Sequence, residues 1–181
     1  IFFTLDIFVY GISLSIYTGG LYNYYNLTKE DIAFITIWFY IANALFQIPA
    51  GWITDKIGNK KTLILSQFFG FGFFFINILS VIFWMNNIIF SLILNLSIGY
   101  VLFALSVVTF IPAEQVIMTN LGENQKAESY GIISFFRGLG LIPTGIIGGL
   151  LVENVHYITP LIFSVIGIFI EFFFLIKFFH D

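Results

Sequence analysis

The stretch GWITDKIGNKK, residues 51–61, is the one dense polar run in an otherwise apolar chain. It separates two apolar stretches, residues 31–53 and 62–84. Each is longer than the about 20 residues with which a helix crosses a hydrocarbon core about 30 Å thick. Two glycines permit a tight turn with close helix approach, and an Asp beside cations can hold against the N-terminus of a neighbouring helix. The stretch therefore predicts two membrane-spanning helices joined by a short charged loop.

The composition of the whole chain extends this prediction. Of the 181 residues, 59% are apolar and 9% are charged, and 25 are Phe, whereas a soluble domain carries about 25% charged residues. The sequence predicts an all-α integral membrane protein, a single six-helix transmembrane bundle over residues 1–181. The six predicted helices cover residues 2–25, 31–53, 62–84, 88–111, 129–152 and 159–179.

The ends of these helices follow from local breaks. Asn86-Asn87 forms a turn, and a Pro112-Ala113-Glu114 break ends the fourth helix. Pro143 falls inside the fifth helix, where membrane bundles tolerate kinks. The third and sixth helices are almost entirely apolar, so we expect them to face lipid, with the Phe runs at residues 73–75 and 172–174 on their surfaces.

The distribution of lysines predicts the orientation. The side that holds both termini carries an excess of lysines, so both termini are predicted to be cytoplasmic and the membrane is predicted to be the cell membrane. The opposite side has only Lys29. The lysines on the side of the termini are Lys56, Lys60, Lys61, Lys126 and Lys177.

Several classes of function are disfavoured. The net charge of −3 leaves no dense positive surface for nucleic acid, and the lack of cysteine removes disulfides and thiolate chemistry. The predicted spans lack paired aspartates and a histidine base, so an intramembrane enzyme is not expected, nor any cofactor. No filter-like or voltage-sensor pattern favours a channel. His156 beside Glu153 is interpreted as a solvated loop, so no metal site is predicted.

The polar run resembles the signature G-x-x-x-D-[RK]-x-G-[RK]-[RK] of the major facilitator superfamily, in which it follows the second helix of each half. Asn59 departs from it by taking the first of the closing basic positions. In the family this motif helps to hold one closed state. The residues of this predicted conformational-lock motif are Gly51, Asp55, Lys56, Gly58, Lys60 and Lys61.

A second similarity to the family lies in NQKAESYGIISFFRGLGLIPTGIIGGLL, residues 124–151. It departs from the stricter G-P-x-x-G-G antiporter pattern, so antiport is not inferred. The fourth helix lacks the Arg found in many N-terminal halves, and the chain starts at Ile1, so we expect the C-terminal half of a longer protein.

The resemblance implies half of a twelve-helix secondary transporter that moves a small solute by alternating access. The implied partners are the lipid bilayer, the solute and the other six-helix half, either upstream in the same chain or as a second subunit. A non-transporting scaffold or receptor on the same fold, or a degenerate transporter fragment, is the alternative. The solute, the coupling ion and the direction of transport do not follow from the sequence.

Polar residues recur on one face of the first helix at helical spacing. In the family the first and fourth helices line the cavity, so the resemblance points these side chains toward a solute. Helix packing is the alternative, because polar residues also join membrane helices. A polar stripe on the second helix is interpreted as a seam between helices or halves. The predicted substrate-binding or cavity-lining residues are Asp6, Tyr10, Ser13, Tyr17 and Asn95.

Charges inside a span cost roughly 2.5–3.5 kcal/mol each and need partners or water. We hypothesise that Arg137 pairs with Asp6 or Glu171 as part of a cytoplasmic gate or an ion-coupling, proton-responsive site. A static ion pair or a side chain that extends to the membrane surface is the alternative. Glu114 is predicted to have no partner cluster.

Overall fold

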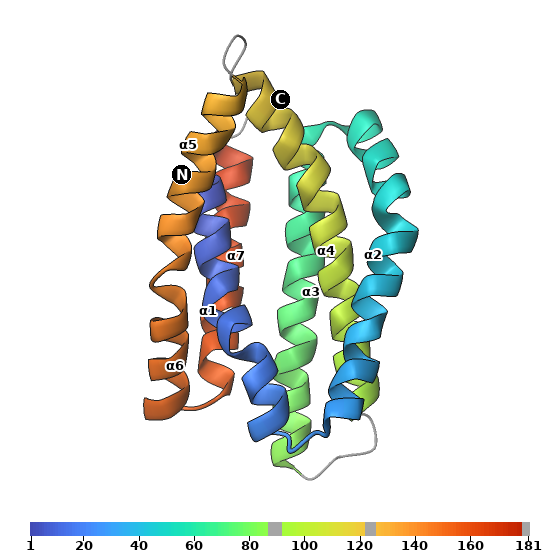
Figure 1. Ribbon diagram of the computed structural model, residues 1–181, viewed down its shortest axis with the longest axis vertical. Coiled ribbons are helices and arrows are strands. Elements are labelled where there is room, and N and C mark those ends of the chain that lie inside the picture. The colour runs from blue at the N-terminus through green and yellow to red at the C-terminus, as the bar shows by residue number, and fades with distance from the viewer. Residues whose placement is uncertain (87–91, 122–125, 179–181) are drawn as a thin grey trace.

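The computed structural model describes residues 1–86, 92–121 and 126–178, which form helices that run along the long axis of a bundle (Figure 1). In the described part, six candidate spans are long and apolar enough to cross a membrane, as predicted, because α5 and α6 together make the single span Tyr130–Asn154. The helices are α1 (Phe2–Asn23), α2 (Lys29–Ile57), α3 (Asn59–Met85), α4 (Leu92–Leu121), α5 (Lys126–Leu141), α6 (Thr144–Asn154) and α7 (Ile158–Phe178).

The charged loop after α2 is shorter than the sequence predicts. Thr28 and Asp31 start α2 with a reciprocal capping box, in which the Asp31 N–H donates to Thr28 Oγ1 over 3.2 Å. The helix then continues to Ile57, and α3 begins at Asn59. Only Gly58 separates the two helices, at φ 85° and ψ 164°, a conformation open essentially to glycine alone.

Pro112 departs from the prediction, whereas Pro143 lies at a break inside one span. Pro112 does not end α4, which continues for more than two turns to Leu121. Pro143 does interrupt the predicted fifth helix, which the structure divides into α5 and α6. A proline removes one backbone donor, and neighbouring helices decide whether the chain continues through it or bends. The predicted start of the fourth helix, residues 88–91, and Asn87 of the predicted turn lie outside the described residues.

The expectation that the third and sixth helices face lipid along their Phe runs is wrong in part. Phe73 and Phe74 on α3 are fully buried, and only Phe75 of that run is about half exposed. Helix α3 packs against α2, α4 and α7, so part of its surface, including Phe73 and Phe74, is buried. Lipid tails and a protein core are equally apolar, so hydropathy cannot separate the two environments.

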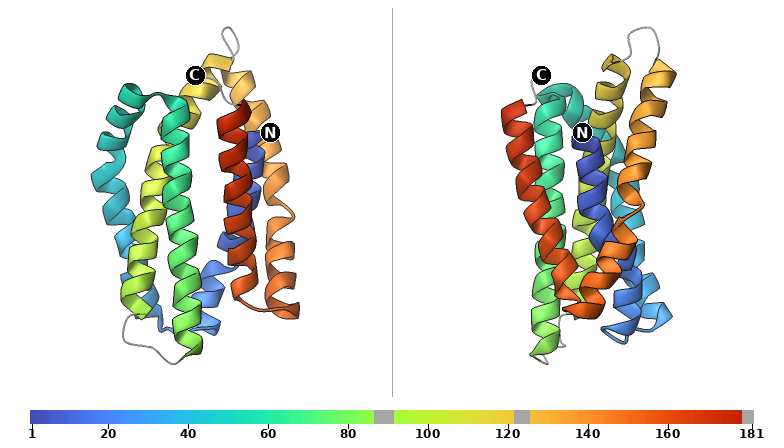
Figure 2. Two further views of the ribbon diagram at one scale, coloured as in Figure 1. Left: turned by 180° about the vertical axis from the view of Figure 1, so that it is seen from behind. Right: turned by 90° about the vertical axis from the view of Figure 1, so that its left-hand side faces the viewer.

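The helices form two groups, which meet mainly where α3 packs against α7 and where α4 packs against α5. In one group α1 packs against α5, α6 and α7; in the other, α4 packs against α2 and α3. In chain order, the first three spans are α1 to α3 and the last three are α4 to α7. The first helix of each set thus packs against the later helices of the other set, an arrangement typical of inverted repeats. Helices α3 and α7 lie together on the side opposite to α1, α2, α4 and α5 (Figures 1 and 2).

The bundle has two distinct ends. The terminal end holds Ile1, the end of α7 at Phe178 and the Gly58 turn (Figure 1). The opposite end holds the connection between α1 and α2 and the connection between α6 and α7.

Candidate functional site

Tyr10 lies at the centre of a buried polar network in the terminal half of the bundle. Its hydroxyl donates to Gln67 Oε1 over 3.3 Å and lies 3.3 Å from Ser106 Oγ. The amide of Gln67 in turn donates from Nε2 to Asp6 Oδ1 over 2.7 Å. Gly70 is required beside this network, because a Cβ there would overlap the Tyr10 hydroxyl. The network joins α1, α3 and α4, and it gives the buried Asp6 one neutral donor.

Ser13 contributes to the contact between α1 and α7. Its Oγ lies 2.7 Å from Ser164 Oγ, and Ser164 donates to the Val9 carbonyl over 2.6 Å. Because the Ser164 proton is used on Val9, Ser13 is the donor of the bond between the hydroxyls. The pair links two helices across a fully buried contact.

Tyr17 and Asn95 lie farther toward the opposite end. The Tyr17 hydroxyl donates to Asn77 Oδ1 over 2.5 Å, and Asn77 Nδ2 donates to the Phe73 carbonyl over 2.8 Å. Asn95 is half-buried on α4. Eleven residues of helix, roughly 16 Å, separate Tyr17 from Asp6. The five predicted solute residues therefore do not form one cluster, and their role in binding a solute stays a prediction.

The predicted pairing of Arg137 with Asp6 or Glu171 is wrong. Arg137 Nη1 on α5 makes an ion pair with Glu114 Oε1 on α4. Since α4 continues past Pro112, it carries Glu114 to the side of α5, whereas the sequence predicted a helix end and no partner there. Asp6 still interacts electrostatically with both members of this pair.

Glu171 is the most isolated charged side chain of the predicted set. It is fully buried on α7, and among the described residues neither of its carboxylate oxygens has a hydrogen-bond partner. It interacts electrostatically with Asp6 on the neighbouring α1. The structure therefore brings Asp6 and Glu171 into one charged environment, and Arg137, which the sequence analysis paired with one or the other, binds Glu114 instead.

The predicted lock motif lies at the terminal end. Lys60 Nζ donates to the Ile176 carbonyl over 3.3 Å and so ties the start of α3 to the end of α7. Asp55 and Lys56 are exposed, as is Lys61. A Cβ on Gly51 would meet nothing within 4 Å, so the expected close helix approach at this glycine is not found among the described residues.

An aromatic cluster occupies the opposite end. The rings of Tyr24 and Tyr157 stack with centroids 4.7 Å apart, and the ring of Tyr25 meets both Tyr157 and Trp84 edge-on. Within the described part of the chain, the buried hydroxyls of Tyr25 and Tyr157 have no hydrogen-bond partner. Burial raises the pKa of both hydroxyls, so they stay uncharged.

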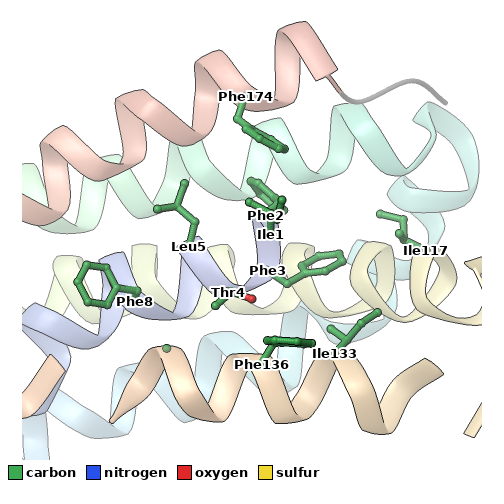
Figure 3. Close-up of a pocket in the computed structure, with 11 residues that line it drawn as sticks. Ile1, Phe2, Phe3, Thr4, Leu5, Phe8, Ile117, Ile133, Phe136 and Phe174 are labelled. Carbon is green, nitrogen blue, oxygen red and sulfur yellow. The ribbon is translucent and has the colours of Figure 1, made fainter. Parts of the chain in front are cut away.

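A cavity of about 830 Å³ lies at the terminal end between α1, α4, α5 and α7 (Figure 3). Its wall is apolar: Phe2 and Phe3 come from α1, Ile133 and Phe136 from α5, and Phe174 from α7. No group of three or more His, Asp or Glu side chains that could hold a metal occurs among the described residues.

Gln67 and Asn77 were missed in the sequence analysis. Their buried amide oxygens accept hydrogen bonds from the hydroxyls of Tyr10 and Tyr17. They are spaced ten residues apart on α3, nearly three helical turns, so they share one face. Two amides on one face of an otherwise apolar span were the available signal, since such residues face the bundle interior.

The inverted packing of two groups of helices, with buried polar residues between them, defines a class of multi-pass membrane transport proteins. Within this class the chain belongs to the major facilitator superfamily, whose sequence profile matches residues 1–181. No curated protein matches it. The protein is thus an integral membrane transporter of this superfamily, whose members are not enzymes, and its six-helix bundle is consistent with one half of the fold.

Proposed function

We propose that this bundle is one half of a secondary active transporter that moves a small solute by alternating access. The observation that carries the proposal is the exchange of first helices, in which α1 packs with α5, α6 and α7 and α4 packs with α2 and α3. A bundle built from two such groups, with α3 packed against α7, is suited to rock as a unit against the second half. The two halves would rock around a solute site in the membrane.

The face opposite to α3 and α7 supports the docking of a second half. Helix α2 and the span formed by α5 and α6 are the least buried of the candidate spans. Large apolar side chains along α2, such as Leu45 and Trp52, are about two-thirds exposed. The second half is either in the same chain or a second subunit, and the remaining exposed surface contacts lipid.

The lock motif supplies a contact for the closed state. Asp55 is exposed and makes no hydrogen bond or ion pair with the residues that the structure describes. Lys60 fixes the neighbouring end of α3 to α7. In the proposed mechanism Asp55 docks against a helix N-terminus of the other half when the terminal side closes.

The solute would bind along α1 and α4, where Asp6, Tyr10, Ser13, Tyr17 and Asn95 supply polar groups. Four of these side chains, Asp6, Tyr10, Ser13 and Tyr17, are engaged inside the bundle by Gln67, Ser164 and Asn77. Separation of α1 from α3 and α7 would free these side chains for an organic solute. Both termini are proposed to be cytoplasmic in the cell membrane, from the excess of lysines at the terminal end.

Alternating access can be tested with cysteine reporters, because residues 1–181 contain no cysteine. Thr18→Cys reports from the exposed surface of α1 toward the opposite end, and Ser134→Cys reports from exposed α5 toward the terminal end. Each variant is reconstituted in liposomes and labelled with a membrane-impermeant maleimide. The labelling rate is measured without solute and with each member of a panel of solutes. A transported solute should raise the labelling rate of one reporter and lower that of the other.

Uptake into the same liposomes completes the test. Asp55→Asn should reduce uptake of the solute severalfold at an equal amount of folded protein. Glu30→Gln, an exposed carboxylate near the start of α2, is the matched control and should leave uptake unchanged. A scaffold or receptor would instead bind its ligand with no opposite change at the two reporters and no uptake.

A further inference from the structure

Helices α1 and α7 run antiparallel and meet in a regular ladder. Successive contacts lie seven residues and then three or four residues apart on each helix, about two turns and one turn, which keeps one face of each helix against the other. The contacts, from the terminal end inward, are Phe2 with Phe174, Val9 with Gly167 and Ser13 with Ser164. Asp6 and Glu171 fall between the first and second contacts, so the register of the ladder places the two carboxyl groups at one level.

Among residues 1–86, 92–121 and 126–178, the groups that face Glu171 supply no positive charge. From α1, Asp6 and Tyr10 interact with it electrostatically. From α3, Lys60 donates to the Ile176 carbonyl, more than one turn beyond Glu171. Helix α6 carries Glu153, which is exposed at the opposite end, and Lys177 of α7 itself is exposed. Neither oxygen of Glu171 has a partner among the described residues.

The charge around Asp6 is also unbalanced. Its close polar partner is the neutral amide of Gln67, and the nearby Arg137 is already paired with Glu114. Asp6 and Glu114 thus share a single guanidinium, and the charged group that acts on Glu171 is Asp6. A second uncompensated carboxylate inside a membrane costs several kcal/mol, and a buried carboxyl avoids that cost by holding a proton.

We propose that Asp6 and Glu171 form a carboxyl pair that binds one proton, and that this pair couples transport to a proton gradient. The coupling rests on the proposed transport function, whereas the proton site does not. The proton passes from water to a Glu171 carboxylate oxygen, where an O–H bond forms. It leaves to water when the same bond breaks, so no other reactant is needed.

The cavity at the terminal end marks the side from which the proton reaches the pair. The stacked rings of Phe2 and Phe174, with centroids 6.2 Å apart, lie one helical turn from Asp6 and Glu171 on that side. Both rings line the cavity of about 830 Å³ (Figure 3). The cavity therefore comes within one turn of the carboxyl pair, and the Phe2 and Phe174 rings separate the two.

Infrared difference spectroscopy of the intact protein in lipid tests the site with protons as the only ligand. A protonated carboxyl gives a C=O stretch that is distinct from the bands of a carboxylate. The wild-type protein should show one such band at neutral pH, Glu171→Gln should lose it, and Asp6→Asn should shift it. Glu114→Gln is the matched control and should keep the band, because its carboxylate is neutralised by Arg137.

The outcomes separate the site from the function. Absence of the band in the wild-type protein, or its persistence in Glu171→Gln with no shift in Asp6→Asn, overturns the proton site. Labelling of the Thr18→Cys reporter should also change with pH, and that change should vanish when Glu171→Gln is added. A band lost in Glu171→Gln together with a pH-independent reporter supports the site and overturns its coupling role. If the band is lost in Glu171→Gln but the cysteine reporters respond to no solute, the proton site is supported and the proposed transport function is contradicted.

Discussion

The two ends of α1 bury polar groups in different ways. At the terminal end the buried groups are carboxylates, and they are met by the amide of Gln67, the guanidinium of Arg137 or, as we propose for Glu171, a proton. At the opposite end they are phenols, and two of these, Tyr25 and Tyr157, have no hydrogen-bond partner among the described residues.

The difference reflects the cost of burial. A neutral hydroxyl without a partner costs about 1–3 kcal/mol, whereas an isolated ionised group costs far more. Aromatic packing can therefore hold unpaired phenols at one end, while the other end needs counter-charges or protons. The terminal end is thus suited to respond to ions, and the opposite end to pack tightly. The predictions below test this contrast, from the largest expected effect to the smallest.

Breaking the ion pair at the terminal end should give the largest loss of stability. Arg137→Met leaves the Glu114 carboxylate buried without its cation and should lower the free energy of unfolding by roughly 3 kcal/mol, at the low end for a buried pair because Arg137 is 26% exposed. Unfolding in detergent micelles followed by tryptophan fluorescence measures this.

The double variant Arg137→Met with Glu114→Gln removes both charges and should recover most of the lost stability. Lys177→Met, which changes an exposed cation near the end of α7, should have little effect. Equal stability of Arg137→Met and the wild-type protein would contradict the contrast, because it would mean that the terminal end tolerates a lone buried charge.

Tight packing at the opposite end is tested with two adjacent glycines. A Cβ on Gly20 would overlap the ring of Tyr157, which is buried between Tyr24 and Tyr25. Gly20→Ala should therefore cost about 2 kcal/mol of overpacking, measured by the same unfolding assay. At Gly19 a Cβ meets nothing within 4 Å, so Gly19→Ala should be neutral or slightly stabilising. Similar effects at both glycines would show that the aromatic cluster is loosely packed.

The turn at the terminal end offers a second pair of glycines. Gly58 has φ 85°, where a side chain is strained, so Gly58→Ala should cost about 1.5 kcal/mol. Gly51 lies inside α2 with open space at its Cβ position, and Gly51→Ala should be neutral or stabilising. The assay is again unfolding in micelles. A larger loss for Gly51→Ala than for Gly58→Ala would reverse the roles assigned to the two signature glycines.

Removing single hydroxyls should give the smallest effects. Tyr17→Phe deprives Asn77 of its donor and should cost about 1 kcal/mol. Tyr25→Phe removes a hydroxyl that has no partner among the described residues, so thermal unfolding should show no loss of stability. If Tyr25→Phe were as destabilising as Tyr17→Phe, the Tyr25 hydroxyl would have a partner that this structure does not show.

Much of the fold could be predicted from the sequence because it depends on local properties. Six apolar stretches, interrupted by the Asp55 to Lys61 run, predict six spans, and the spacing of Gly51, Asp55 and Gly58 indicates the family. The breaks at Pro112 and Pro143 were predicted less well, because a proline leaves the choice between a kink and a helix end to its tertiary neighbours.

The candidate site was predicted only in part. Helical spacing correctly placed Asp6, Tyr10, Ser13 and Tyr17 on one face of α1, but it carried no information on which helix that face meets. The pairing of Arg137 with Glu114 depends on how far α4 extends, and the isolation of Glu171 depends on the register of α1 and α7.

The sequence by itself therefore determined the membrane class, the six spans and the family, since hydropathy and motif spacing act within one segment. The tertiary structure alone decided that Phe73 and Phe74 of α3 are buried, that Arg137 binds Glu114 and that Asp6 lies level with Glu171. These features depend on contacts between segments far apart in the chain. In a membrane, packing and polar pairing between helices set such contacts, because apolar side chains are solvated equally well by lipid and by protein.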